Sequence, residues 1–551
     1  MRYAFVDAMT DKKYSTAIFA VLLAALAAAV YWQSTGFELV DLDDLEYTVY
    51  NPIVSGGLTW TGIKAAFTQF SQKYWIPVTW LSYMADVSVS GMSPAAFHRT
   101  NVILHSLNAS LVFLLFRFAT GSGWKSFFAA ALWALHPLRV ESVAWVTERK
   151  DVLAGFFFLL ALLGHFRYVK TEKKLWLAAI ALCALLGLMA KPVVMVLPVA
   201  MLLLDFWPLG RFPEGGFKAN PKGCGRLLLE KAHLFALSVV FVIVTVRAQA
   251  IEGAFNVDAG RSGLYENLAT AVKAYSAYLY ETVWPAGLFV RGQEYVTHFG
   301  YAATALCLGG LVLVSFLAFR FRKSCPELAF GWFWYLLILF PNSGIVQAGM
   351  NTFSDRFTYL PHVGLTVGAV WGAERLYSRF FADIRPLVAL CAVLLTVLPV
   401  LSYRQTGVWR DDFTLFGYID RVTGGRSALA KSVLGGAFMR AGKYQEAYDN
   451  YSYALRLDPY TPRGNGDKGM AAAKLGRFRE AADLYRMELR ASPGDRQFCI
   501  RLANVLIVAG DLPGAARQGL ENIRQWPGDK EAWEAVNYLG GEEKAKALAK
   551  R

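Results

Sequence analysis

The sequence predicts an all-α protein, in which a polytopic helical membrane core is followed by a domain of helical repeats. Three observations predict this class. Only 18% of the 551 residues are charged, whereas soluble domains carry about a quarter. Apolar stretches long enough to cross a bilayer recur along residues 1–402. A short pattern then recurs every 34 residues up to the C-terminus.

The net charge of +14 does not indicate nucleic acid, because membrane proteins carry basic residues on their cytoplasmic loops. We therefore expect no nucleic-acid partner. The six cysteines are scattered, without a CxxC pair or a spacing typical of metal ligands. Neither a zinc site nor a disulfide framework is indicated.

The apolar windows predict about eleven transmembrane helices. They lie near residues 15–33, 98–119, 126–145, 152–169, 175–190, 192–208, 232–250, 300–319, 328–341, 359–376 and 386–402. Lys and Arg gather at every second boundary between them, which makes those boundaries cytoplasmic. We expect a plasma (inner) membrane protein with a cytoplasmic N-terminus. Because the number of spans is odd, the repeat domain is expected on the periplasmic, extracytoplasmic side.

Two long segments are then expected on the outer side, 33–97 and 251–299. The first holds two apolar-periodic stretches rich in Trp and Tyr, which are typical of helices lying in the membrane interface. It also holds Val40–Pro52, in which acidic residues crowd together. These are Asp41, Asp43, Asp44 and Glu46.

Four carboxylates so close to hydrocarbon repel one another and resist desolvation, so they need water, cations or a metal. An acidic patch on an outward loop is the alternative. Other charges are expected on the same side, however: Arg139, Glu141, Glu148, Arg149, Lys150, Asp151, Lys191, Arg247, Asp355 and Arg356. Carboxylates facing fixed cations suit a substrate with an anionic head and a lipid tail. Lys191 alone could also be a lysine that snorkels from a helix end.

After the last window, KYQEA, RFREA and DLPGA begin at residues 443, 477 and 511. Small and aromatic residues around the first of them fall where tetratricopeptide repeats require them. We expect a linker at 403–427 and a repeat domain at 428–551. Its repeats are placed at 428–461, 462–495 and 496–529, with a capping helix at 530–551. Such repeats present a concave surface that binds a peptide or a protein, the alternative being an assembly platform.

Four stretches resemble a known family. NPIVSGGLTW, HPLRVESVAWVTERKDVL, GLMAKPVVMVLPVAMLLLDFWPLGR and SDRFTYLPHVGL are similar to the membrane core of the TMTC group and its bacterial relatives. These proteins join a GT-C glycosyltransferase core, here 1–402, to C-terminal tetratricopeptide repeats. The resemblance covers essentially the whole chain. It implies glycosyl transfer from a polyprenyl-phosphate sugar on the extracytoplasmic face. In eukaryotic relatives the sugar is mannose and the acceptor a protein Ser or Thr hydroxyl.

The resemblance also implies roles for the charged residues. Asp43 and Asp44 occupy the place of the acidic motif of GT-C enzymes, so that one of them would be the catalytic base. Candidates for the donor phosphate are Arg149, Lys150, Lys191, Arg356 and Arg291. Candidates for orienting these cations or binding sugar are Asp41, Glu46, Glu141, Glu148 and Asp355.

No cofactor is required by this scheme. A divalent ion, Mg or Mn, held by Asp43 or Asp44 is the alternative, because GT-C enzymes that transfer oligosaccharides use one. Those that transfer single sugars to proteins do without, and we favour that expectation.

Three other functions remain open at the level of sequence. An oligosaccharyltransferase or glycan ligase would use the same charges. A non-catalytic membrane scaffold with repeats would not need Lys191 or the ERKD run. A translocase for lipid-linked sugars would need a continuous polar path across the membrane, whereas the polar groups gather mainly at one end of the helices.

Overall fold

The computed structural model describes residues 13–213, 220–251, 264–289, 300–345 and 353–551. Over these residues the chain is helical and contains no strand beyond an isolated bridge between Ser71 and Tyr74. It divides into two compact units, Met1–Arg410 and Asp411–Arg551. The all-α prediction is confirmed.

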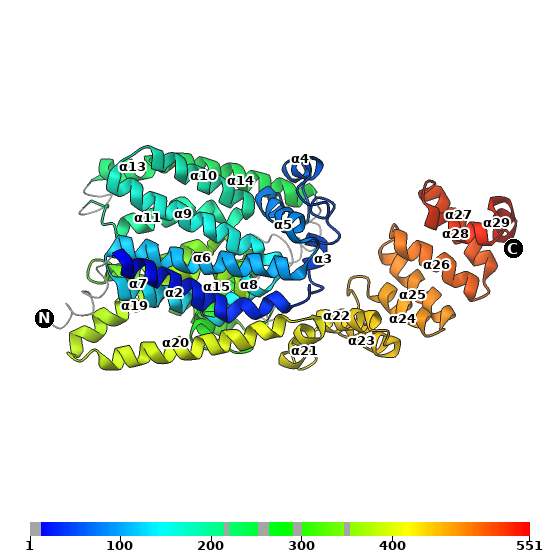
Figure 1. Ribbon diagram of the computed structural model, residues 1–551. Coiled ribbons are helices and arrows are strands. Elements are labelled where there is room, and N and C mark those ends of the chain that lie inside the picture. Colours follow the sequence, from blue (N-terminus) through cyan, green and yellow to red (C-terminus); the bar gives the residue numbers. More distant parts are fainter. Residues whose placement is uncertain (1–12, 214–219, 252–263, 290–299, 346–352) are drawn as a thin grey trace. The chain divides into compact units, whose positions relative to one another are not determined.

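Each predicted apolar window overlaps a helix of the first unit, although not every window is a single helix. These helices are α2 (Lys13–Tyr31), α6 (Pro94–Thr120), α7 (Gly123–Ala134), α9 (Arg149–Thr171), α10 (Leu175–Ala190), α11 (Leu197–Phe206), α14 (Ala232–Ile251), α17 (Tyr301–Arg320), α18 (Pro326–Leu339), α19 (Pro361–Phe380) and α20 (Arg385–Thr406). Among the described residues, 6 helices are long and apolar enough to cross a membrane, namely α2, α6, α9, α14, α17 and α20. The protein is therefore a membrane protein. Figure 1 shows the helices of this unit running alongside one another.

One window, 126–145, is not a single helix. Helix α7 ends at Ala134, and the chain continues through two short turns of helix, η2 (Pro137–Arg139) and α8 (Val140–Ala144). Pro137 causes the break, because it lacks an N–H donor and disfavours helical geometry at the preceding residue. Residues 137–148 therefore form short helical turns instead of continuing α7.

The two stretches rich in Trp and Tyr form helices α4 (Trp60–Thr68) and α5 (Pro77–Ser90). Together with the short α3 (Asp44–Tyr47) they gather at one end of the first unit (Figure 1). A buried aromatic cluster around Trp80 and Tyr83 holds them against the start of α6. We call this end the acidic-loop end, and the other end the basic end.

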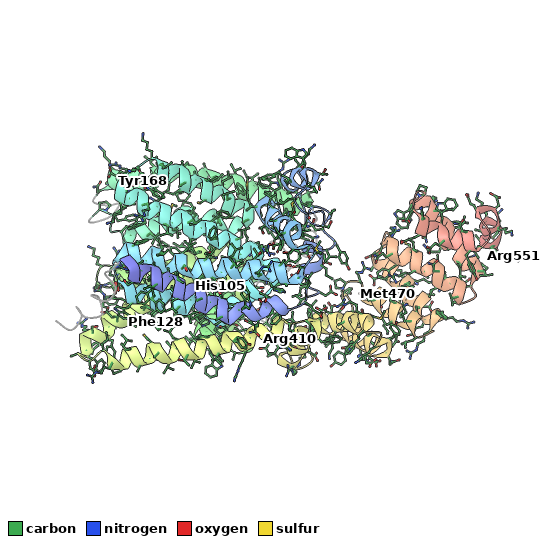
Figure 2. The ribbon with its side chains drawn as sticks, viewed as in Figure 1. His105, Phe128, Tyr168, Arg410, Met470 and Arg551 are labelled. Atoms are coloured by element: carbon green, nitrogen blue, oxygen red, sulfur yellow. The ribbon has the colours of Figure 1, made fainter. Side chains whose placement is uncertain are left out.

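The centre of the first unit is tied together by buried polar groups. His105 lies on α6 (Figure 2), where its ring contacts the Ala134 carbonyl oxygen at 3.0 Å and the Tyr359 hydroxyl at 2.9 Å. Trp133 donates to the Tyr359 carbonyl oxygen at 2.7 Å. These bonds join α6, α7 and the start of α19 where no water could replace a lost partner.

Helices α18 and α19 approach closely through glycines. A methyl group on Gly331 would lie 2.7 Å from the Gly364 carbonyl oxygen and 2.9 Å from the Gly368 Cα. A methyl group on Gly364 would lie 2.3 Å from the Trp334 ring. Small residues permit such contact between membrane helices, where packing replaces the hydrophobic effect as the source of association.

The second unit consists of α21 (Asp412–Val422) and a series of antiparallel helix pairs. The pairs are α22 (Ala428–Arg440) with α23 (Tyr444–Leu457), α24 (Gly464–Lys474) with α25 (Phe478–Ala491), α26 (Arg496–Val508) with α27 (Leu512–Gln525), and α28 (Lys530–Tyr538) with α29 (Glu542–Ala549). The recurring glycines, Gly442, Gly476 and Gly510, have φ of +73°, +77° and +83°. Glycine recurs there because each turn needs this left-handed conformation.

Two details of the second unit differ from expectation. The segment 403–427, expected as a linker, holds the end of α20, the turn η7 (Gly407–Trp409) and all of α21. The C-terminal segment 530–551 is a pair of helices rather than one. Gly540 and Gly541, with φ of +93° and +98°, make the turn between them.

The packing of α18 on α19 gives a first prediction. Gly364→Ala should destabilise the protein by roughly 1–3 kcal/mol, because the added methyl group overlaps Trp334. Gly309→Ala is the matched control, since nothing lies within 4 Å of a methyl group there. Thermal unfolding in detergent would measure both. Equal midpoints for the two variants would contradict the close contact.

Candidate functional site

The acidic stretch is held in place by Asp44. Its side chain is fully buried and accepts hydrogen bonds from the Thr147 N–H at 2.9 Å, the Thr147 hydroxyl at 2.7 Å and the Val40 N–H at 3.1 Å. Asp43, one residue earlier, is exposed. Adjacent carboxylates therefore have different roles, since Asp44 binds protein groups and Asp43 faces outward.

The remaining acidic residues of the stretch, Asp41 and Glu46, are partly buried. Burial raises the pKa of Glu46, and the charges of Asp41 and Asp43 raise it further. Burial likewise raises the pKa of Asp44 to about 7, although the bonds from Thr147 and Val40 oppose the shift.

A buried ionic network lies next to the segment that Asp44 holds. At its centre is Glu148, which is fully buried and contacts three cations. Its carboxylate lies 3.2 Å from Lys150 Nζ, 3.4 Å from Lys191 Nζ and 3.1 Å from Arg356 Nε. We call Glu141, Glu148, Asp151, Lys150, Lys191 and Arg356 the Glu148 network.

The other two carboxylates of the network complete the pairing. Asp151 lies 2.6 Å from Lys191 Nζ and accepts a hydrogen bond from Ser142 at 3.3 Å. Glu141 pairs with the Arg356 guanidinium and accepts from the Arg356 N–H at 3.3 Å. Three carboxylates thus face three cations, which is the balance that buried charges require.

Burial and the charges of neighbouring residues shift the pKa values of the network residues in opposite directions. Burial raises the pKa of Glu141 to about 7, and the charge of Arg356 opposes that rise. Burial disfavours the charged form of Arg356, but Glu148 and Glu141 outweigh it and hold its pKa above the ordinary value. The Arg356 guanidinium also lies 5.1 Å from the Trp145 ring centre, a cation–π distance.

Lys150 connects the network to the acidic stretch. Its ammonium lies 4.8 Å from the Tyr47 ring centre and 5.7 Å from that of Tyr74. Asp43 is close enough to interact electrostatically with it. Lys150 is therefore the member of the network that interacts electrostatically with the exposed Asp43.

The structure places Arg149 elsewhere. Its guanidinium is fully buried and directed at α5 and α6, where it bonds Asn101 Oδ1 at 2.8 Å, Asp86 at 2.5 Å and the Phe97 carbonyl oxygen at 2.6 Å. The residues of the ERKD run therefore have different partners. Arg149 connects α9 to α5 and α6, whereas its neighbours Glu148 and Lys150 belong to the Glu148 network. Arg291 lies outside the described residues.

Asp355 begins η6 (Asp355–Thr358), is buried, and lines a cavity of about 10 Å³ together with Glu141 and Trp409. This cavity has room for a single water.

Two functional neighbours were not singled out from the sequence. Thr147 has no charge to attract notice, yet it supplies two of the three bonds to Asp44. Arg139 was expected only as an outward charge. It is fully buried, and its Nη2 lies 2.5 Å from Thr358 Oγ1 and 3.2 Å from His362 Nδ1.

The Asp44 carboxylate is already occupied by hydrogen bonds and is not available to a metal ion. Within the described ranges, no three or more His, Cys, Asp or Glu residues are grouped so that they could hold a metal ion. Both Asp44 oxygens already accept hydrogen bonds from the protein.

Asp44 gives a pH prediction. Its pKa of about 7 exceeds the value of 3.8 in an unfolded chain, so folding takes up a proton between about pH 4 and pH 7. Stability should therefore rise as the pH falls from 8 to 5, and Asp44→Asn should make this rise smaller. Unfolding midpoints of both proteins across that range would test it. Parallel pH profiles would show that Asp44 does not titrate in this way.

Comparisons with known proteins agree with this architecture. The family described as tetratricopeptide repeat matches residues 432–496 and 466–530. Protein O-mannosyl-transferase TMTC2 of Homo sapiens is 33% identical over 102 residues, 18% of this chain and 12% of that protein. Protein O-mannosyl-transferase TMTC1 of Mus musculus is 35% identical over 157 residues, 27% of this chain and 17% of that protein.

A protein O-mannosyl-transferase of Caenorhabditis elegans is 23% identical over 467 residues, 80% of this chain and 62% of that protein. The chain thus spans less than two thirds of the length of each of these relatives. Taken with the apolar helices and the helix pairs, these matches identify a TMTC-like membrane protein with tetratricopeptide repeats in its C-terminal unit.

Proposed function

We propose that this protein is an inverting GT-C glycosyltransferase that moves a sugar from a polyprenyl-phosphate donor to a protein Ser or Thr hydroxyl. The names of its relatives support mannose as the sugar. The observation that carries the proposal is the Glu148 network, in which three cations converge on one buried carboxylate and one of them, Lys150, also interacts electrostatically with the exposed Asp43.

In this proposal Lys150, Lys191 and Arg356 bind the donor phosphate. Their charges are matched by carboxylates in the free protein, so an arriving phosphate competes with Glu148 and Asp151 for the same ammonium groups. Lys191 is the most accessible of the three, with 12% of its side chain exposed. The new bonds to phosphate would be charge-assisted, as are the bonds to carboxylate that they replace.

Asp43 acts as the base, and Asp44 positions it. The acceptor hydroxyl loses its proton to Asp43 while its oxygen attacks the anomeric carbon. The bond from that carbon to the phosphate oxygen breaks, and its electron pair leaves with the lipid phosphate. Negative charge grows on that phosphate in the transition state, where fixed cations lower the barrier most.

The acidic-loop end is proposed to face the extracytoplasmic side. Basic residues at the helix ends opposite it support this orientation, because such residues remain in the cytoplasm. They include Arg117, Lys125, Arg320, Arg322, Arg375 and Arg385. An extracytoplasmic site also gives access to secreted acceptors.

The helix pairs of the second unit are proposed to recruit the acceptor protein or a partner. Neighbouring repeats are joined by polar contacts on their exposed faces, such as Arg477 to Gln445 at 3.0 Å and Arg463 to Gln497 at 2.9 Å. A stacked, polar surface of this kind suits recognition of an extended peptide.

The division between the two aspartates is testable. Asp43→Asn should reduce turnover by about 10²–10⁴-fold, the usual cost of losing a general base, without changing the unfolding midpoint. Asp44→Asn should lower both the turnover and the unfolding midpoint, because the acidic stretch loses an acceptor for its N–H donors. Glu38→Gln removes an exposed carboxylate from the same loop and serves as control. Full turnover in Asp43→Asn would exclude it as the base.

Lys191 can be tested separately from the stability of the network. Lys191→Gln should weaken donor binding about tenfold or more, and should also destabilise the protein by leaving Asp151 without its cation. The double change Lys191→Gln with Asp151→Asn removes both charges, so it should recover stability but not donor binding. Binding of a polyprenyl-phosphate sugar and thermal unfolding provide the two readouts. Recovery of donor binding in the double variant would give Lys191 a structural role only.

Truncation tests the role of the second unit. A chain ending at Arg410 should bind the donor and glycosylate a short peptide as the full chain does. Transfer to a native protein acceptor should fall, because the recruiting surface is gone. The measurement is transfer to both acceptors side by side. An equal loss for peptide and protein would make the second unit part of the catalytic fold.

A further inference from the structure

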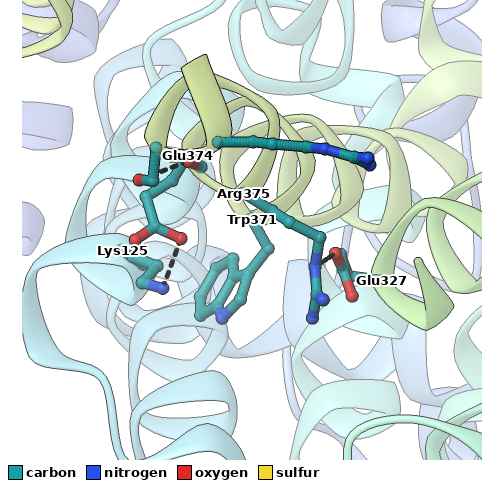
Figure 3. Close-up of a pocket in the computed structure, with 7 residues that line it drawn as sticks. Lys125, Glu327, Trp371, Glu374 and Arg375 are labelled. Atoms are coloured by element: carbon teal, nitrogen blue, oxygen red, sulfur yellow. Dashed lines mark hydrogen bonds and ion pairs between the residues drawn. The ribbon is translucent and has the colours of Figure 1, made fainter. Parts of the chain in front are cut away.

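The basic end of the first unit contains an open pocket that plays no part in the proposed reaction. It has a volume of about 380 Å³ and lies between the first turns of α7 and α18 and the last turns of α19. Its lining residues are Lys125, Glu327, Trp371, Glu374, Arg375, Ser378 and Arg379. Figure 3 shows Lys125 and Arg375 reaching toward it from either side of the Trp371 ring.

The charges of this pocket leave a cation in excess. Lys125 Nζ lies 2.9 Å from Glu374, and Arg375 Nε pairs with the buried Glu327. Both lining carboxylates are therefore already engaged. Arg379 is exposed and forms no ion pair within the part of the chain that the structure describes.

The arginine donors are suited to a phosphate. Because Arg375 uses Nε for Glu327, its two terminal nitrogens remain for a ligand, and its side chain is 52% exposed. Arg379 adds a second planar guanidinium one turn along the same helix. Two guanidinium groups can bind the oxygens of one phosphate in a forked arrangement that a single lysine cannot provide.

Exposed apolar side chains lie on the last turns of α19 and directly after it, although they do not line the pocket. Leu376, Phe380 and Phe381 are exposed at 48%, 72% and 58%. Lys125 lies 5.9 Å from the ring centres of both Trp124 and Trp371. Exposed apolar residues beside tryptophans and arginines at helix ends are typical of the boundary between headgroups and hydrocarbon.

We propose that this pocket binds the phosphate headgroup of an anionic phospholipid. The excess cation and the arginine forks select the phosphate, and the exposed apolar side chains at this end of α19 contact the acyl chains of the bound lipid. A free phosphate shares the headgroup chemistry but makes no use of those apolar residues. The proposal is independent of the proposed glycosyl transfer.

The test is native mass spectrometry of the full chain in detergent, titrated with phosphatidylglycerol, with phosphatidylcholine or with inorganic phosphate. The wild type should bind phosphatidylglycerol more tightly than phosphatidylcholine. Arg379→Gln should weaken phosphatidylglycerol binding about fivefold, the usual contribution of one basic residue near a membrane surface. Arg379→Lys should recover part of the loss, because it restores the charge without the fork.

Arg385→Gln is the matched control, since Arg385 lies at the same end, is exposed and does not line the pocket. It should bind phosphatidylglycerol as the wild type does. Equal losses in Arg379→Gln and Arg385→Gln would overturn the pocket in favour of diffuse surface charge. Equal binding of both lipids would overturn the anionic headgroup. Displacement of phosphatidylglycerol by millimolar inorganic phosphate would reassign the pocket to a free phosphate.

Discussion

The candidate site depends on the hydrogen bonds between Asp44 and Thr147. Asp44 lies in the first long loop, and Thr147 lies in the irregular segment that follows α7. These bonds hold the loop near Glu148, which directly precedes α9, and Lys150, which lies in the first turn of α9. Without them, Asp43 would have no defined position relative to Lys150. A buried carboxylate with this many donors is costly to replace, because each N–H left behind would be unsatisfied.

The second constraint is charge balance within the Glu148 network. Its residues come from α8, η3 (Val146–Glu148), α9, the end of α10 and η6, so several chain segments must meet for any charge to be matched. Removing one partner leaves another charge buried and unpaired. This lowers the free energy of unfolding by far more than an exposed ion pair would contribute to it. The network is therefore both a structural joint and a set of cations in fixed positions. That combination suits the stabilisation of a developing charge, which requires donors that do not reorganise during the reaction.

Hydropathy and periodicity were sufficient for the helices and the repeats, because both depend on patterns spread over many residues. They were insufficient where a single residue determines the local structure. Pro137 divides a window whose composition resembles a single span. Arg149 and Lys150 are neighbours in a basic run, yet one is enclosed by Asn101 and Asp86 while the other meets Glu148. Adjacent side chains at a helix start point in different directions, and only the neighbouring elements determine which direction is buried.

The same reason explains why sequence alone could not decide between Asp43 and Asp44 as the base. Both are carboxylates in one acidic run, and the difference between them is the presence of Thr147, about a hundred positions away.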